Sequence, residues 1–331
     1  MADYKQPQPR FVLLKGTRAT TLVRRLLAKT VPAAVVDNID RMAARMVSLH
    51  LSRGRTFEQS SECQSASTLM SVVVPIHDAP FVTKRCLASL ERYGKRAEII
   101  LVDDGSRLPE TAAIIREFSN RNGWNVISNA RAGGHSAACR EGARVASRPY
   151  LCLLNSDTVV TPWCWRGIQR AFAADSSIGA VGPSTSYSGN QQALNVAIYC
   201  RSHWNDSQIC AFAERLMAVP LQPELFDLSW ISGFAFFIRR NLWEQLGGFD
   251  QHLPDYGNEV ELCRRVTKSG YRIVWVRTAY IHHLGQLSYR ATMGQHEISQ
   301  RKVGALRYIV DTHNWQPSDG SPAGDRPAQS K

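Results

Sequence analysis

The stretch SVVVPIHDAPFVTKRCLASL, residues 71–90, joins two patterns of different period. Residues 71–76 form a largely apolar run rich in valine, which is typical of a buried strand. From residue 81 to residue 93, apolar side chains recur at helical spacing. A buried strand followed at once by a helix is the repeating unit of α/β proteins with parallel sheets.

The same alternation continues along the chain. Further strands are predicted within 97–106, 123–128 and 149–157, with helices at 109–120 and 136–147. The later part is less regular, with extended segments at 229–240 and 271–283 and helices at 241–248 and 258–270. This order predicts an α/β fold with a mostly parallel sheet, right-handed crossovers and flanking helices.

Acidic side chains stand where the predicted strands end: Asp78, Asp103, Asp104 and Asp157. In open α/β sheets, ligands bind outside the carboxyl ends of the strands, so these carboxylates should meet at the ligand edge. Carboxylates suit a hard divalent cation, and a histidine adds a nitrogen ligand, which together indicate Mn²⁺ or Mg²⁺. His282 and His283 follow a late strand, and alternation along that strand lets one of them face the cleft.

Several common sites are disfavoured by their missing motifs. No G-x-G-x-x-G follows the first strand, no G-x-x-x-x-G-K-[ST] is present, and no G-x-S-x-G occurs. These absences argue against a dinucleotide fold, a P-loop and a serine hydrolase elbow.

The charge is unevenly distributed over the 331 residues. Residues 1–68 hold 11 Lys and Arg against 5 Asp and Glu. The difference, a charge of +6, is half of the net charge of +12. Such an arm suits contact with anionic lipid or nucleic acid, or it solubilises the chain as a basic helical extension. No window has the roughly 20 apolar residues of a membrane span, and the N-terminus lacks a secretory pattern, so a cytoplasmic protein is expected. The eight cysteines form no C-x-x-C pair, which favours reduced structural thiols.

Five segments resemble, in order and at suitable distances, the inverting family-2 glycosyltransferases of the GT-A fold. They are SVVVPIHDAPFVTKRCLASL, IILVDDGS, LCLLNSDTVV, ISGFAFFIRRNLWEQLGGFD, and YGNEVELCRRV with the later GYRIVWV and AYIHHLGQLSY. The similarity is to the branch with bacterial rhamnosyltransferases and other transferases of surface-polysaccharide assembly. It covers residues 70–290, between a basic helical extension and linker (1–69) and a C-terminal helix with a disordered tail (291–331).

The resemblance assigns donor-binding roles near the first two strands. Pro75, His77 and Asp78 would border the donor nucleotide, with His77 against the base and Asp78 where the family usually has Asn. Asp103 or Asp104 would accept a hydrogen bond from the base or ribose. The alternative is that these residues only form turns.

Asn155–Ser156–Asp157 resembles the metal-binding D-x-D motif with Asn in its first position. The resemblance makes Asp157 a metal ligand, adds Ser156 to the donor site, and makes His283 the first and His282 the second histidine ligand. Because this motif has one carboxylate fewer than D-x-D, we expect modest metal affinity in the absence of donor. The alternative is an ordinary loop and a structural His–His pair.

Glu259 stands where the family has its catalytic base, which takes a proton from the acceptor hydroxyl. It shares a helical face with the apolar Leu262 and Val266, so burial should raise its pKa. The alternative makes Glu259 a first-turn carboxylate on a helix capped by Asn258, with Glu261 as the capping partner. We assign the capping role to Glu261.

Three further features have two readings each. Gly233 would let the backbone approach the donor sugar, although its segment also reads as a core strand. The polar segment 182–192 either borders the sugar and acceptor or is an ordinary loop. Arg131 and Arg140 either pair with the diphosphate or are solvated surface residues.

The sequence thus predicts a metal-dependent inverting glycosyltransferase. The expected partners are a nucleotide-sugar donor and a saccharide or lipid-linked saccharide acceptor, with peripheral contact to the inner face of the membrane through the basic arm and no nucleic acid. The alternatives are a nucleotidyltransferase on a similar sheet and a non-catalytic nucleotide-sugar-binding scaffold docked at the membrane.

Overall fold

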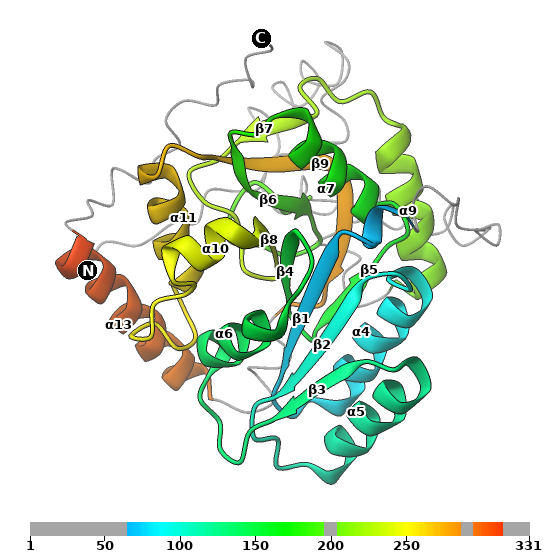
Figure 1. Cartoon of the computed structure of the whole chain (residues 1–331), viewed down its shortest axis with the longest axis vertical. Helices are drawn as coiled ribbons and strands as arrows, with labels where there is room; N and C mark the ends of the chain where they lie inside the picture. Colours follow the sequence, from blue (N-terminus) through cyan, green and yellow to red (C-terminus); the bar gives the residue numbers. More distant parts are fainter. Residues whose placement is uncertain (1–64, 195–203, 286–293, 314–331) are drawn as a thin grey trace, which may run out of the picture.

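The computed structural model describes residues 65–194, 204–285 and 294–313. The predictions for the basic arm up to residue 64 and for the tail from residue 314 lie outside the described residues. The first half alternates strands and helices as predicted: β1 (Met70–Ile76), α4 (Pro80–Tyr93), β2 (Glu98–Asp103), α5 (Pro109–Asn122), β3 (Asn125–Ser128), α6 (His135–Val145) and β4 (Tyr150–Leu154) (Figure 1). These four strands are parallel, in the order β3-β2-β1-β4.

The second half is less regular, as expected. It contains β5 (Thr158–Val160), α7 (Cys164–Ala174), β6 (Ile178–Ser184), α9 (Asp206–Ala218), β7 (Leu225–Asp227), β8 (Ala235–Arg239), α10 (Arg240–Leu246), α11 (Asn258–Lys268), β9 (Arg272–His283) and α13 (Gln295–His313). In the described part of the chain, nine strands form one sheet of order β3-β2-β1-β4-β8-β6-β9-β5, with β7 beside β9.

The α/β class is confirmed, and the sheet is mixed beyond β4. Strand β8 runs antiparallel to both β4 and β6, and β5 and β7 run antiparallel to β9. The expectation of a mostly parallel sheet therefore holds for β1 to β4 and for the β6–β9 pair only. The predicted strand at 229–240 is also shorter, because β8 begins at Ala235.

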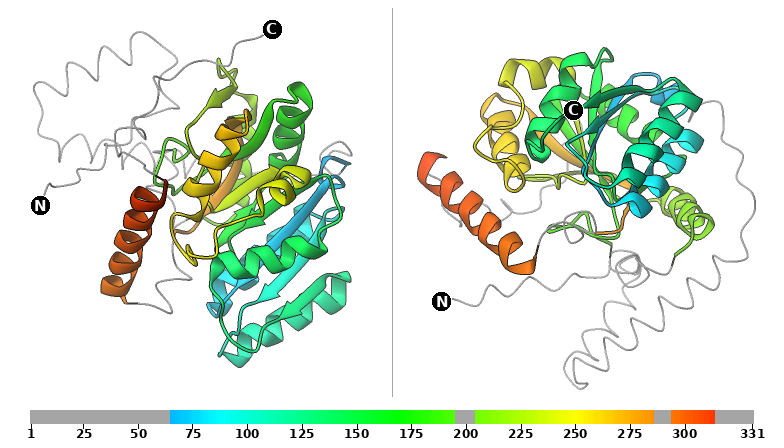
Figure 2. Two further views of the ribbon diagram at one scale, coloured as in Figure 1. Left: turned by 60° about the vertical axis from the view of Figure 1, so that its left-hand side comes forward. Right: turned by 90° about the horizontal axis from the view of Figure 1, so that it is seen from below.

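Helices cover both faces of the sheet (Figure 2). One apolar core lies under α4, α5 and α7, and a second lies under α6, α10 and α11. The small residues of α6 let it approach β1 closely. A Cβ atom on Gly142 would lie 2.3 Å from Cγ1 of Val73, so no side chain fits at that point. This close contact holds the N-terminus of α6 near the ends of β1 and β2.

The described cysteines are free and buried: Cys86, Cys139, Cys152, Cys164, Cys210 and Cys263. This is the state expected for structural thiols. Burial raises the pKa of Cys86 to about 12, so its thiol stays protonated near neutral pH. Within the described residues, no helix is long and apolar enough to cross a membrane.

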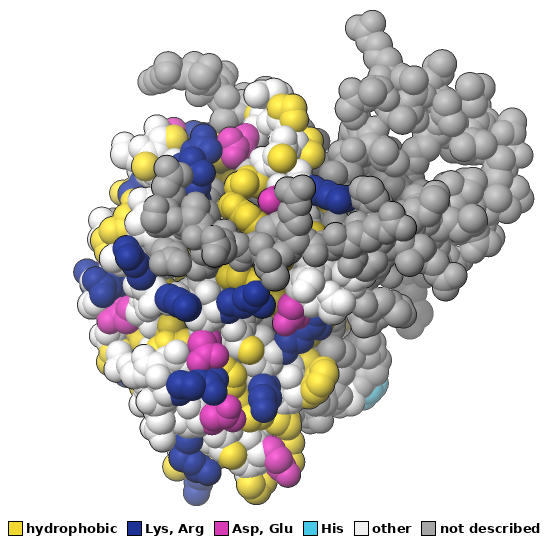
Figure 3. Space-filling view, turned by 90° about the vertical axis from the view of Figure 1, so that its right-hand side faces the viewer, with side chains coloured by type: hydrophobic (Ala, Val, Ile, Leu, Met, Phe, Trp, Pro, Cys, Tyr) yellow, Lys and Arg dark blue, Asp and Glu magenta, His cyan; other side chains and the backbone are white. Residues whose placement is uncertain are grey.

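The face that carries α4, α5 and α9 has mixed charge. Figure 3 shows Lys and Arg side chains there with Asp and Glu between them. An ion pair of Arg85 with Asp206 joins α4 to α9, one of Arg121 with Glu91 joins α5 to α4, and one of Arg121 with Glu117 lies within α5. Such exposed pairs add little stability, typically about 0–1 kcal/mol each.

Candidate active site

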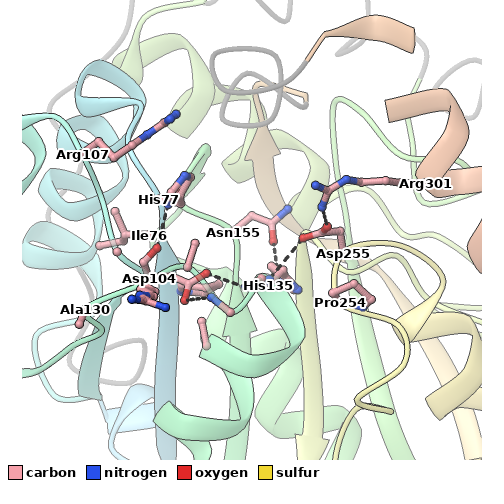
Figure 4. Close-up of a pocket in the computed structure, with 18 of the residues that line it drawn as sticks. Ile76, His77, Asp104, Arg107, Ala130, His135, Asn155, Pro254, Asp255 and Arg301 are labelled. Atoms are coloured by element: carbon pink, nitrogen blue, oxygen red, sulfur yellow. Dashed lines mark hydrogen bonds and ion pairs between the residues drawn. The ribbon is translucent and has the colours of Figure 1, made fainter. Parts of the chain in front are cut away.

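A pocket of about 640 Å³ opens at the carboxyl ends of β1, β2 and β4 (Figure 4). The loop before α11 and the helix α13 form its opposite wall. It is lined by Pro75, Ile76, His77, Asp104, Gly105, Arg107, Ala130, Arg131, Ala132, Gly133, Gly134, His135, Ala138, Asn155, Ser156, Pro254, Asp255, Glu297 and Arg301. Five of the predicted donor-binding residues are therefore in one pocket: Pro75, His77, Asp104, Ser156 and, as an alternative reading, Arg131.

The ends of β1 and β2 are joined across the pocket floor. Nδ1–H of His77 donates to the carbonyl oxygen of Asp104 at 2.8 Å. The buried carboxylate of Asp104 accepts hydrogen bonds from the backbone N–H groups of Gly133 (2.8 Å) and Gly134 (2.9 Å). Gly134 has a φ of +88°, which a residue with a side chain rarely adopts. Asp104 thus fixes the glycine loop that leads into α6.

The other two strand-end carboxylates hold turns. Oδ1 of the buried Asp78 accepts from the backbone N–H groups of Arg107 and Leu108, each at 2.8 Å. Asp103 accepts from the backbone N–H of Ser106 at 3.0 Å and lines a separate groove beside α5 and β3. The structure therefore brings Asp104 to the main pocket, whereas Asp78 and Asp103 do not line it. Their geometry matches the turn-forming alternative.

Asp157 and His283 meet although they are far apart in sequence. Strands β5 and β9 pair so that Thr158 lies opposite His283. This pairing brings Oδ1 of Asp157 within 3.2 Å of Nε2 of His283, and both side chains are buried. Nδ1–H of His283 donates to the carbonyl oxygen of Tyr187 at 2.9 Å.

The hydrogen bond made by Nδ1 of His283 leaves the other ring nitrogen, Nε2, facing the Asp157 carboxylate. Because Nδ1 carries the proton in a neutral ring, Nε2 points a lone pair at the Asp157 carboxylate. Nε2 has no hydrogen-bond partner among the described residues. A histidine that donates one ring N–H to a backbone carbonyl is the usual arrangement of a metal ligand. Within the described ranges, no group of three His, Cys, Asp or Glu side chains could hold a metal ion.

His282 lies on the other face of β9. Its Nδ1 is 2.8 Å from the Tyr280 hydroxyl, and its ring stacks on Trp204 with 5.9 Å between centroids. The alternation of side chains along a strand explains the separation. The structure thus does not bring the second predicted histidine ligand to Asp157.

Glu259 lies in the first turn of α11, half-buried against Gly233. A Cβ atom on Gly233 would lie 3.6 Å from Cδ of Glu259. Burial raises the pKa of the Glu259 carboxyl, and a hydrogen bond from the backbone N–H of Gly233 and the nearby Lys302 partly offset that rise. Gly233 therefore faces the carboxyl group of Glu259.

The segment Gly233–Phe234 links Glu259 to the Asp157–His283 pair. The Phe234 ring stacks on the ring of His283 with 5.3 Å between centroids. The carbonyl oxygen of Phe234 accepts from the backbone N–H of Asn155 at 2.9 Å. The Glu259 carboxyl group therefore adjoins Gly233, and the Asp157–His283 pair adjoins the next residue, Phe234.

The start of α11 differs from the predicted capping. Gly257, at φ +77°, is the N-cap residue, so Asn258 is already helical. The Asn258 side chain donates to Oγ of Ser136 at 2.8 Å instead of capping the helix. Glu261 forms a salt bridge with Arg265, so its predicted capping role is wrong. With Gly257 as the N-cap, Glu261 is the fourth helical residue and not the third, which is the position of a capping-box partner.

The polar segment 182–192 packs against the Asp157–His283 pair. Oγ of Ser186 accepts from the backbone N–H of His283 at 2.9 Å, and the Tyr187 ring meets the His283 ring edge-on. The Gln192 side chain accepts from the backbone N–H of Ser232 at 2.8 Å. This segment therefore packs against the Asp157–His283 pair, and its proposed contact with sugar and acceptor stays a prediction.

Several pocket residues are absent from the prediction. His135 begins α6, and its Nε2 lies 3.1 Å from Oδ1 of Asn155. Burial lowers the pKa of His135, which favours the neutral ring. Arg301 of α13 forms an ion pair with Asp255 at the pocket wall. Arg140, by contrast, donates to the carbonyl oxygen of Phe249. His135 follows a Gly–Gly pair before a helix, and that was the one local signal available for it.

The sequence matches two family profiles. One, described as "Glycosyl transferase family 2", matches residues 71–218, and the other, "Glycosyl transferase family group 2", matches residues 150–302. Among curated proteins, the O-antigen biosynthesis protein RfbC of Myxococcus xanthus is 27% identical over 76% of this chain and 21% of its own length. The N-acetylglucosaminyl-diphospho-decaprenol L-rhamnosyltransferase of Mycobacterium tuberculosis is 24% identical over 70% of this chain and 80% of its own length.

The chain also spans about half of a probable glycosyltransferase, YdaM, of Bacillus subtilis, at 27% identity over 62% of this chain. Two solved structures share the fold. The mannosyltransferase PcManGT of Pyrobaculum calidifontis, in complex with GDP-Man and Mn²⁺, has a TM-score of 0.54 at 14% identity, covering 86% of this chain and 75% of its own. GalNAc-T7 with UDP, GalNAc and Mn²⁺ has a TM-score of 0.52 at 19% identity, covering 72% and 49%.

Proposed function

Because the chain belongs to glycosyl transferase family 2 and has the GT-A fold, we propose that it is a metal-dependent, inverting glycosyltransferase. It would move a sugar from a nucleotide-sugar donor to a hydroxyl group of a saccharide or lipid-linked saccharide. The observation that carries this proposal is the arrangement around Gly233–Phe234. Glu259 lies beside Gly233, and the Asp157–His283 pair lies beside the next residue, Phe234, so a candidate base and a candidate cation site adjoin the same short segment.

In the proposed reaction, Glu259 accepts the proton of the acceptor hydroxyl. The hydroxyl oxygen forms a bond to the anomeric carbon, and the bond from that carbon to the diphosphate oxygen breaks. The electron pair of the broken bond leaves with the nucleoside diphosphate, and the configuration at the anomeric carbon inverts. Asp157 and His283 would hold Mn²⁺ or Mg²⁺, which neutralises the developing charge on the diphosphate.

The main pocket is proposed to hold the nucleotide. His77, Asp104 and Pro75 would border the base and ribose, and Ser156, which precedes Asp157 in the sequence, lines the same pocket. The M. tuberculosis relative is named for a diphospholipid-linked sugar, and a lipid-linked acceptor is proposed here by analogy. Such an acceptor lies at a membrane, where the basic arm of residues 1–68 would suit anionic lipid.

The proposal is tested by thermal denaturation with UDP-, GDP- and dTDP-sugars, each with and without Mn²⁺. A ligand that binds the folded state raises its stability, by about 2.7 kcal/mol at 100 times its Kd. We expect the Tm to rise by several degrees with one nucleotide class, and more with Mn²⁺ than with chelator. No rise with any donor would contradict the proposal. Binding with no sugar transfer would favour the scaffold alternative, and consumption of a nucleoside triphosphate with a sugar 1-phosphate would favour the nucleotidyltransferase.

The raised pKa of Glu259 predicts the pH dependence of turnover. Glu259 acts as a base only when deprotonated, so the rate should fall as pH drops through its pKa. That acid limb should lie above the ordinary glutamate value of about 4.3. The measurement is kcat/KM against pH, with donor affinity measured over the same range. Loss of donor affinity along with the rate would attribute the limb to donor binding instead, and a rate unchanged down to pH 4 would contradict the assignment.

A further inference from the structure

A chain of hydrogen bonds runs from the base helix to the pocket and fixes the direction of each donor. It begins at the backbone N–H of Glu259, which donates to Oδ1 of Asn258 at 2.8 Å. Because a backbone N–H can only donate, the other end of the Asn258 amide is the NH₂ group. That group donates to Oγ of Ser136 at 2.8 Å and lies 3.3 Å from Nδ1 of His135.

The orientation of the Asn258 amide determines which ring nitrogen of His135 carries the proton. Since Nδ1 of His135 faces the donor group of Asn258, Nδ1 is the acceptor and the ring proton is on Nε2. Nε2–H of His135 therefore donates to Oδ1 of Asn155, 3.1 Å away. The same logic then fixes the Asn155 amide, whose oxygen is turned toward His135.

The NH₂ group of Asn155 consequently points away from His135 and into the pocket (Figure 4). An aspartate at this position would turn a charged acceptor oxygen in the same direction. Either residue could accept Nε2–H of His135 through Oδ1, so Asn and Asp differ here only in the group that faces the pocket. The motif presents a hydrogen-bond donor where a carboxylate would present only acceptors.

The surroundings of Asn155 suit an anion. The Asp104 carboxylate already accepts two backbone N–H bonds, and Asp255 and Glu297 are both paired with Arg301. Arg131 adds positive charge to the lining, as does Arg107, whose Nε also lies 3.6 Å from the Asp78 carboxylate. Asp157 follows Asn155 by two residues and pairs with His283. In the proposed function, the diphosphate of the donor lies beside this pair. An amide N–H near that point would meet a phosphoryl oxygen.

We infer that the Asn155 amide donates a hydrogen bond to a diphosphate oxygen of the donor, and that His135 is a positioning residue that sets the direction of this amide. The inference rests on the proposed function and adds to it a neutral recognition element for the diphosphate. It requires that His135 acts on the ligand only through Asn155.

The test is a double-mutant cycle on Asn155→Ala and His135→Phe, read by calorimetric titration of UDP, GDP and dTDP in saturating Mg²⁺. A hydrogen bond to a charged group is worth about 1.5–3 kcal/mol, so Asn155→Ala should weaken diphosphate binding by about 10- to 100-fold. His135→Phe should weaken it in the wild-type background and have no further effect in the Asn155→Ala background. His135→Gln, whose amide N–H can replace Nε2–H, should restore binding.

Asn125→Ala is the matched control, because Asn125 is exposed on the edge strand β3 and does not line the main pocket. Its Kd should equal that of the wild type. Unchanged binding by Asn155→Ala would overturn the inference alone, as would equal effects of His135→Phe in both backgrounds. Failure of the wild type to bind any nucleoside diphosphate would overturn the inference and the proposed function together.

Discussion

Replacing Glu259 with glutamine should reduce sugar transfer by ~10²–10⁴-fold, the usual contribution of a general base. Glutamine keeps the shape of the side chain but cannot take a proton from the acceptor hydroxyl. The Kd for the nucleoside diphosphate should stay unchanged, because Glu259 does not line the pocket proposed for the nucleotide. The measurement pairs a steady-state transfer assay with calorimetric titration of the same preparation.

Glu261→Gln provides the matched control on the same helix. Glu261 is buried and paired with Arg265, so its loss should lower stability without lowering turnover of the folded enzyme. If Glu259→Gln turned over at the wild-type rate, Glu259 would lose its role as base. If it lost nucleotide binding as well, the effect would be structural.

Asp157→Ala should lower kcat/KM by about 10³-fold and remove the response of the enzyme to Mn²⁺. A bound cation lowers the barrier by several kcal/mol through charge stabilisation, and each 1.36 kcal/mol is tenfold in rate. Asp157 contributes the one carboxylate of the buried pair with His283, so its loss leaves a single protein ligand there. The measurement is a titration of the rate with Mn²⁺ from a metal-free preparation.

The two adjacent histidines distinguish the metal assignment from general destabilisation. His283→Gln should act like Asp157→Ala, because Nε2 of His283 faces the carboxylate. His282→Gln removes an equally buried ring on the opposite face of β9, so it should lower stability and leave the Mn²⁺ response intact. An unchanged Mn²⁺ response in Asp157→Ala, or loss of it in His282→Gln alone, would contradict the assignment.

The strands and helices of the first half were predictable because each is specified by local pattern. The valine-rich run of β1 and the spacing of apolar residues in α4 act over a few residues, and both elements occur within one residue of the predicted bounds. Strand β8 was predicted too long because Ile231 and Phe234 are buried in the core without belonging to the strand.

The site was harder to predict because its geometry depends on distant pairings. Asp157 meets His283 through the β5–β9 register, which no local pattern encodes, and family resemblance supplied that pair. The choice between Asp103 and Asp104 depends on where the chain turns after β2. Asp78 was expected at the donor, but its backbone φ of +54° turns its carboxylate onto the 105–108 turn.

Contacts that helices α11 and α13 make with the pocket could not be predicted from the sequence. His135 and Asn258 lie over 100 residues apart, so neither pattern nor spacing indicates their hydrogen bond. Arg301 belongs to α13, beyond the residues 70–290 whose sequence motifs resemble the family, and it lines the pocket where α13 lies beside Asp255.

The most direct test of the account is the release of nucleoside diphosphate from the preferred nucleotide sugar, followed with acceptor in Mn²⁺ and again after chelation. We predict release by the wild-type protein in Mn²⁺, loss of release with chelator, and loss of release in Glu259→Gln even in Mn²⁺. Two results would contradict the claim that the protein is a metal-dependent glycosyltransferase with Glu259 as its base. One is release that continues in chelator, and the other is release that is undiminished in Glu259→Gln.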